Sequence, residues 1–156
     1  MPTFQLGSAG WRMRRGAALL SVGLACAGGA WSVPDPCKLV TAAEMIQIVG
    51  TLGAPPRATD PASGEITCSF EPSKGPSFVD VSLHDGDLAA WRKRNGGKSP
   101  VALPEFGADA FVNPDFEGMA DLYAKKGALV LRVTLSKGPQ AVEQAKAIAR
   151  KALPRL

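Results

Sequence analysis

The sequence predicts an α+β domain: a mainly antiparallel sheet of about five strands, packed by two or three helices, in the order α-β-β-α-β-β-β-α. Apolar and polar residues alternate over 129–135, as in a strand with one buried face. Pro139 is expected to open a last helix at its first position. Short connections join the strands, which favours antiparallel pairing. The side chains that recur at helical spacing on this last helix, and are expected to dock on the sheet, are Val142, Ala145, Ile148, Ala149 and Ala152.

The first helix is expected to begin at Thr41 and to end at Gly50. Thr41 and Glu44 have the spacing of a capping box, in which each side chain bonds to the backbone N–H of the other residue. Val40 and Met45 occupy the positions of a hydrophobic staple across this helix start. The side chains expected to point into the core are Met45, Ile46 and Val49.

The next part of the chain predicts two strands. Residues 53–64 are rich in Pro, Ala and Gly, and we expect a loop there. Residues 65–70 and 78–84 alternate in polarity and are expected to be strands, with a turn at 71–75. Cys68 would then face the core together with its apolar neighbours on the first of these strands.

A short second helix is expected after these strands. Asp85 or Asp87 can cap it, Leu88 and Trp91 lie on it, and Gly96-Gly97 ends it.

Three further strands are expected before the last helix. The segment 108–113 is read as a short strand and 113–118 as a turn. Strands at 119–125 and 128–136 then form a hairpin around Lys126-Gly127.

The front of the chain has the pattern of a secretory signal peptide. Basic residues lie within 12–15, and residues 16–30 are apolar or small without a charge. Ala25-Cys26-Ala27 offers a cleavage site after Ala27, and cleavage after Ala30 is the alternative. The sequence thus divides into a signal peptide, 1–30, and a single domain, 31–156. Translation from Met13 and lipidation of Cys26 are open alternatives, and the apolar run is short for a membrane span.

The basic charge of the chain comes from this front segment. The net charge is +4 from 18 basic and 14 acidic residues. Without Arg12, Arg14 and Arg15 there are 15 basic residues and the net charge falls to +1. We therefore expect no nucleic-acid partner, and a membrane partner only if Cys26 is lipidated.

The cysteine count predicts one disulfide. Of the three cysteines, Cys26 lies in the targeting segment and leaves Cys37 and Cys68 in the exported domain, where such pairs usually bond. There is no CxxC motif, and one histidine with two cysteines is a poor zinc ligand set. No metal or other cofactor is expected.

The start of the domain resembles a family of secreted bacterial proteins. The residues that carry the resemblance are Asp35-Pro36-Cys37-x-Leu39-x-Thr41, then Cys68-Ser69-Phe70, and later the segment 106–111. The family is best known from actinobacterial lipoproteins and is a domain of unknown function. The resemblance implies export and a disulfide, and it brings no catalytic residues. Cys26 departs from the family's lipid-bearing cysteine because Gly23 stands where a leucine is usual.

Two patterns contain the residue types of a known site, a hydrolase triad and a calcium loop, but their spacing argues against both sites. Asp80, Ser82 and His84 are the residue types of a hydrolase triad, yet residues two apart on a strand face are about 6.5–7 Å apart, too far for a base to reach its nucleophile. The segment 113–118 has oxygen ligands at alternate positions before Gly118, but Ala124 stands where a calcium loop needs a bidentate Glu.

One polar sheet face is the candidate binding surface. If helices cover only the apolar side, strand alternation leaves polar and aromatic residues on the other side. The candidate site residues are Asp80, Ser82, His84, Tyr123 and Arg132, with Thr67, Ser69 and Thr134 beside them.

The sequence therefore predicts a periplasmic or extracellular protein of unknown activity, interpreted as a non-enzymatic module that binds a protein or small ligand of the envelope. The alternatives are a secreted enzyme that uses His84 with residues from another strand, and an envelope accessory without a small ligand.

Overall fold

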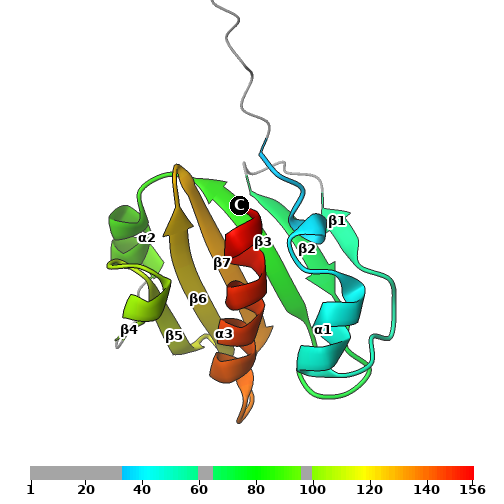
Figure 1. Cartoon of the computed structure of the whole chain (residues 1–156). Coiled ribbons are helices and arrows are strands. Elements are labelled where there is room, and N and C mark those ends of the chain that lie inside the picture. The colour runs from blue at the N-terminus through cyan, green and yellow to red at the C-terminus, as the bar shows by residue number, and fades with distance from the viewer. Residues whose placement is uncertain (1–32, 60–64, 96–99) are drawn as a thin grey trace, which may run out of the picture. The chain divides into compact units, whose positions relative to one another are not determined.

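A single antiparallel sheet organises the domain. The structure is a computed structural model that describes residues 33–59, 65–95 and 100–156. Over these residues, seven strands follow the order β1-β2-β3-β7-β6-β5-β4, with three α-helices packed on the sheet (Figure 1). The predicted α+β class is confirmed. The predicted signal peptide, Cys26 and the expected helix end at Gly96-Gly97 lie outside the described residues.

The eight predicted elements occur in the predicted order, with two short strands added. The strands are β1 (Arg57–Thr59), β2 (Ile66–Phe70), β3 (Val79–Asp85), β4 (Val101–Ala102), β5 (Phe111–Phe116), β6 (Met119–Lys126) and β7 (Leu129–Ser136). The helices are α1 (Ala42–Val49), α2 (Leu88–Asn95) and α3 (Ala141–Ala152), with short 3-10 helices η1 (Pro36–Lys38), η2 (Pro104–Phe106) and η3 (Leu153–Arg155).

The prediction of about five strands was wrong because both edge strands were missed. β1 has three residues, lies in the predicted loop 53–64, and pairs only with β2. β4 has two residues and pairs only with β5. Their residues are exposed, so they show no alternation of polarity, and a neighbouring strand supplies their structure.

The β5–β6 connection is shorter than predicted. Asn113 was expected to open a turn, but β5 continues to Phe116, and only Glu117 and Gly118 form the turn, both with positive φ. The β5–β6 register shifts between Asn113 and Phe116. Pro114 is accommodated because this irregular stretch lies beyond the residues that pair with β4. At the next hairpin, Lys126 pairs with Leu129, so the turn is Gly127-Ala128 rather than Lys126-Gly127.

Helix α1 confirms the predicted cap. The Thr41 hydroxyl accepts from the Glu44 N–H at 3.2 Å, and Glu44 accepts from the Thr41 N–H at 3.0 Å. Met45 and Val49 are buried, and Gly50 ends the helix with φ +90°. The prediction was wrong for Ile46, which is 43% exposed because it lies on the outer side of the helix.

Helix α3 begins two residues later than predicted. Pro139 lies in a turn in which the Ala141 N–H bonds to the Gly138 carbonyl, and the helix starts at Ala141. Ala145, Ile148, Ala149 and Ala152 are buried as expected, and Val142 is partly buried against the same core. The C-terminal helix therefore docks on the sheet as the spacing predicted.

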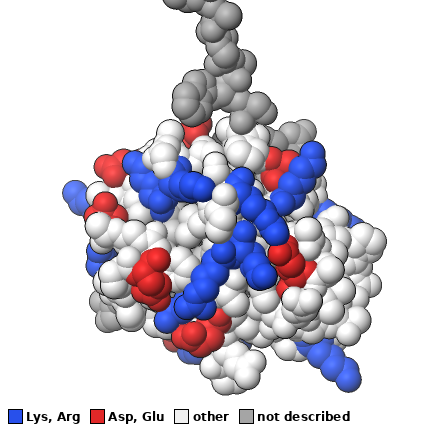
Figure 2. Space-filling view, in the orientation of Figure 1, with Lys and Arg blue, Asp and Glu red and all other residues white. Residues whose placement is uncertain are grey.

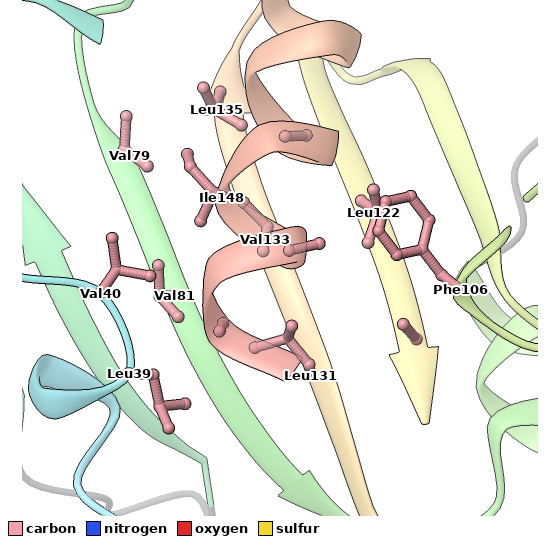
Figure 3. Close-up of a cluster of buried hydrophobic side chains, with 14 of the residues drawn as sticks. Leu39, Val40, Val79, Val81, Phe106, Leu122, Leu131, Val133, Leu135 and Ile148 are labelled. Atoms are coloured by element: carbon pink, nitrogen blue, oxygen red, sulfur yellow. The ribbon is translucent and has the colours of Figure 1, made fainter. Parts of the chain in front are cut away.

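The main core lies between the sheet and the layer formed by η1, α1 and α3. In Figure 3, Ile148 of α3 lies over Val133 of β7, with Val79 and Val81 of β3 beside them. Leu39 and Val40, which join η1 to α1, complete this side of the core. These side chains alternate along each strand with the residues of the opposite face.

A disulfide joins this helical layer to the sheet. Cys37 in η1 and Cys68 in β2 are bonded, with their α-carbons 5.0 Å apart. Cys68 is fully buried and faces the core, as its place on the strand predicted. The predicted pairing is thus shown.

None of the helices in the described parts of the chain is long and apolar enough to cross a membrane.

Candidate functional site

Two rows of side chains cross the sheet on the face opposite α1 and α3. Residues paired across neighbouring strands project to the same side, so the register defines each row. One row is Thr59, Thr67, Ser82, Arg132, Tyr123 and Phe111. The other is Arg57, Ser69, Asp80, Thr134, Asp121 and Asn113. With His84, which follows Ser82 on this side of β3, all five predicted site residues lie on one face.

Helix α2 covers one end of this face, so the condition for one continuous polar face, helices on the apolar side alone, is not met. Leu88 and Trp91 pack with Phe111, Tyr123 and Val130 in a second apolar cluster. These strand residues alternate with the residues of the main core, so α2 lies on the side of the sheet opposite α3. The surface predicted as one polar face is therefore divided into a covered part and an open part.

His84 and Tyr123 belong to the covered part. The His84 ring lies 4.3 Å from the Trp91 ring, and Tyr123 stacks on Phe111 at 4.8 Å between ring centroids. Their exposures are 5% and 1%. Burial raises the pKa of the Tyr123 hydroxyl. Both side chains are therefore part of an aromatic cluster and are not free to meet a ligand.

The open part contains a shallow depression with a volume of about 380 Å³. Its walls combine hydroxyl groups, three charged side chains and two apolar side chains. The hydroxyl residues are Thr59, Thr67, Ser69, Ser82 and Thr134, the charged residues are Glu65, Asp80 and Arg132, and the apolar residues are Phe78 and Met119. Three of the five predicted site residues, Asp80, Ser82 and Arg132, thus line one concave surface.

Arg132 is fixed by two carboxylates. Its Nε and Nη2 donate to the two oxygens of Asp121 at 3.1 and 3.2 Å, and its Nη1 lies 3.7 Å from Glu65. Thr134 also donates to Asp121, which is fully buried. Burial opposes the charge of Arg132, but the hydrogen bonds to Asp121 outweigh it and raise the pKa of the guanidinium. This clamp makes Arg132 a rigid wall of the depression.

Asp80 and Ser82 of β3 bond to β2 and not to each other. The Ser69 hydroxyl donates to Asp80 at 2.7 Å, and the hydroxyls of Thr67 and Ser82 are 2.9 Å apart. Each bond joins residues directly opposite in the register. The structure therefore does not assemble Asp80, Ser82 and His84 into a triad, in agreement with the spacing argument.

Glu65 connects the open and covered parts. Its Oε1 lies 3.1 Å from Nε2 of His84, which is buried and out of line for a hydrogen bond. This contact with His84 is the largest cause that lowers the pKa of Glu65, and Ser82 and Arg132 lower it further against the effect of burial. Glu65 is thus held ionised at the α2 end of the depression.

Five contributors to this site were not among the predicted residues: Glu65, Phe78, Asp121, Met119 and Thr59, which lies on the missed strand β1. Glu65 was assigned to a strand without a role, and Asp121 was hidden among the apolar residues of its strand. Asp121 could have been found, because it alternates with Tyr123 and therefore shares the face of Arg132. Phe78 directly precedes β3 and Met119 is the first residue of β6. At the ends of strands, alternation gives little information about burial.

The opposite face, which carries α3, has charges of both signs. Figure 2 shows Lys and Arg side chains over the middle of this face, with Asp and Glu side chains beside them. Lys146 pairs with Glu143 at 3.1 Å, and Arg155 with Glu44 at 2.6 Å. Such exposed pairs are typical of a solvated surface. The segment 113–118, whose spacing resembles half of a calcium loop, is part of an ordinary strand and turn, and its Asp115 pairs with Lys137.

The comparisons with known proteins assign no family. No protein-family model and no curated protein matches the chain. A solved structure described as a GTP binding regulator from Thermotoga maritima is 20% identical, with 75% of this chain and 90% of that chain covered. Its TM-score is 0.41, and a likeness at this level carries no argument about fold or function.

Proposed function

We propose that the protein is exported and works in the periplasm or outside the cell. The signal-peptide pattern of 1–30 supports export, and the Cys37–Cys68 bond fits an oxidising compartment. N-terminal sequencing of the exported protein tests this proposal, and the expected first residue is Gly28 or Trp31. A lipidated Cys26 as first residue, or recovery only from the cytosol, would contradict a free exported domain.

We also propose that the chain belongs with the secreted family of unknown function that its opening resembles. The local structure gives four of the matching residues, Asp35, Cys37, Leu39 and Thr41, a role. Asp35 accepts from the Cys37 N–H at 2.9 Å, Cys37 forms the disulfide, and Thr41 caps α1. Leu39 is buried in the core. This pattern is what an N-terminal segment needs in order to dock on the sheet, which supports the resemblance without adding an activity.

We propose that the domain is a non-enzymatic module that binds a ligand or partner of the envelope in the depression. The observation that carries this proposal is that the middle strands expose a concave polar surface, while α2 covers only the end near His84. Aligned hydroxyls and carboxylates on a rigid sheet can recognise a polar ligand without losing much conformational freedom.

Amide chemical shifts of the folded domain provide the test. Fractionated envelope extracts are added to ¹⁵N-labelled protein, and we expect shifts that gather at Thr67, Ser69, Ser82 and Thr134. Thr67→Phe should fill the depression and remove these shifts, whereas Thr67→Ser keeps the hydroxyl and should retain them. Binding that shifts the amides of the α3 face instead, or that survives Thr67→Phe unchanged in a folded variant, would contradict the proposal.

The enzymatic alternative is supported by one contact. His84 has Glu65 beside it from outside its own strand, which is the pairing a general base needs for orientation. The imidazole is buried against Trp91, however, and does not line the depression. His84→Ala separates the two functions, because loss of a measured turnover with the fold intact would support the enzyme, and unchanged ligand binding supports the module.

A further inference from the structure

Asp80 is a half-buried carboxylate that has no cationic partner within the described parts of the chain. It lines the depression, and its Oδ1 accepts from the Ser69 hydroxyl at 2.7 Å. Among the described residues, no Lys, Arg or His lies within 4.0 Å of it. A carboxylate withdrawn from water is costly unless a charge or several hydrogen bonds compensate it. From the residues that the structure describes, Asp80 receives one hydrogen bond and no ion pair, so these residues supply only part of this compensation.

The cation of the depression is already engaged by other carboxylates. Of the described residues that line the depression, Arg132 alone is positively charged, and it contacts Asp121 and Glu65. Two carboxylates, Asp121 and Glu65, thus occupy this guanidinium, and Asp80 adds a third negative charge. The excess negative charge disfavours a phosphate or carboxylate ligand and favours a cation.

Two apolar side chains lie at the same end of the depression as Asp80. Phe78 lies two residues before Asp80, directly before β3. Met119 lies two residues before Asp121, at the start of β6. Glu65, in contrast, adjoins His84, about 13 Å along β3 from Asp80 at the usual rise of a strand. A ligand at the Asp80 end would therefore meet one carboxylate and two apolar surfaces.

We propose that the depression takes a ligand with a primary ammonium group on an alkyl stem, with the ammonium at Asp80 and the stem against Phe78 and Met119. This inference rests on the proposed function of the same depression and names the chemistry of its ligand. A free alkyl amine and a lysine side chain of a peptide share this chemistry.

The protonation of Asp80 agrees with this geometry. Burial is the main cause that raises the pKa of Asp80, and the charges of Glu65 and Asp121 raise it further, while Ser69 and Arg132 lower it. A bound ammonium favours the ionised form. Binding should therefore weaken as the pH falls through the raised pKa of Asp80, and the pKa of Asp80 should be lower in the complex.

Pentylammonium is the probe, and the amide shifts of the full exported domain are the measurement. We expect shifts at Ser69, Asp80 and Thr134 for pentylammonium, and none for pentanoate or for pentanol at the same concentration. Asp80→Asn should weaken binding at least tenfold. Asp109→Asn removes the same charge from an exposed site and should leave binding unchanged. Nα-acetyl-lysine N-methylamide distinguishes the sources, since tighter binding than pentylammonium favours a peptide and weaker binding favours a small amine.

The carboxyl ¹³C resonance of Asp80 gives a second measurement that does not depend on a variant. Its titration should move to lower pH when pentylammonium is present. Equal binding of pentanol and pentylammonium, an unchanged Asp80 titration, or an unaffected Asp80→Asn variant would overturn the inference. If an envelope ligand shifts the depression amides while pentylammonium does not, the binding module stands and the ammonium ligand is refuted.

Discussion

Reduction of the Cys37–Cys68 bond should destabilise the domain and loosen its N-terminal segment first. The bond spans a separation of 31 residues and joins η1 to β2, the strand next to the edge of the sheet. Apart from this bond, the segment is held by the burial of Leu39 and Val40 and by Arg155, which donates to the Leu39 carbonyl at 2.7 Å. These contacts remain after reduction, so we expect a folded but less stable protein.

The magnitude follows from the loop that the bond closes. For 31 residues, the chain-entropy relation gives a loss of about 12 cal/mol/K in the unfolded state, or about 3.7 kcal/mol at 25 °C. A unit of 125 residues, Ser32–Leu156, has an unfolding entropy of about 260 cal/mol/K near its melting temperature. The two numbers predict a fall in Tm of about 10–15 °C. Measured losses are often smaller than this relation gives, so a few degrees is the lower limit of the expectation.

Calorimetry with and without reductant measures this change, with mass spectrometry to show that the bond has been reduced. A Cys37→Ser/Cys68→Ala variant is the control, because reductant should not alter its Tm. Hydrogen exchange should quicken in α1 before it quickens in the β6–β7 hairpin. A Tm that stays within about 2 °C after complete reduction would refute the entropic argument. Faster exchange in the hairpin than in α1 would refute the assignment of the bond to the N-terminal segment.

Three further perturbations test the contacts that hold the helices and the site. Thr41→Ala should lower the free energy of unfolding by about 0.5–2 kcal/mol in chemical denaturation, because the Glu44 N–H loses its acceptor; an unchanged value would show that Thr41 does not act as the cap. Hydrogen bonds from Arg155 and from the Thr41 N–H lower the pKa of Glu44 from 4.5 to about 2. The stability difference between wild type and Glu44→Gln should therefore be complete above pH 4.5 and shrink as the pH falls toward 2, and a difference that grows on acidification would have the wrong sign. Asp121→Asn should cost about 2–3 kcal/mol of unfolding free energy, since Arg132 loses a bidentate carboxylate, and a cost below about 0.5 kcal/mol would show that this charge pair contributes little to stability.

Local signals in the sequence were sufficient for the features that depend on neighbours in the chain. The capping box of α1 needs only Thr41 and Glu44 at a fixed spacing. Cys68 was placed on the inner face because its strand alternates, and that placement made its bond to Cys37 geometrically reasonable. The long β7 alternation likewise predicted that Leu131, Val133 and Leu135 enter the main core, although Leu129 on the same face is only partly buried.

Features that depend on distant partners could not be predicted in this way. β1 exists because β2 offers an unpaired edge, and its three exposed residues have no pattern of their own. The continuation of β5 through Pro114 depends on β4 being too short to require a hydrogen bond there. Both cases involve the edges of the sheet, where pairing rather than composition determines the structure.

Only part of the candidate site was predicted, because the cover that a helix gives to a sheet face also depends on distant partners. Strand alternation is enough to place Asp80, Ser82, His84, Tyr123 and Arg132 on one face, but it says nothing about which part of that face a helix covers. Helix α2 packs the apolar side chains of Leu88 and Trp91 against the sheet, and its last turn is basic, so its sequence does not show which side it packs against. The aromatic residues Phe111 and Tyr123 on the polar face supply the missing signal. Large aromatic side chains on an otherwise polar sheet face require cover, and the short helix that carries Trp91 is the element that provides it. This cover removes His84 and Tyr123 from solvent and leaves Asp80, Ser82 and Arg132 as the part of the prediction on which ligand binding can depend.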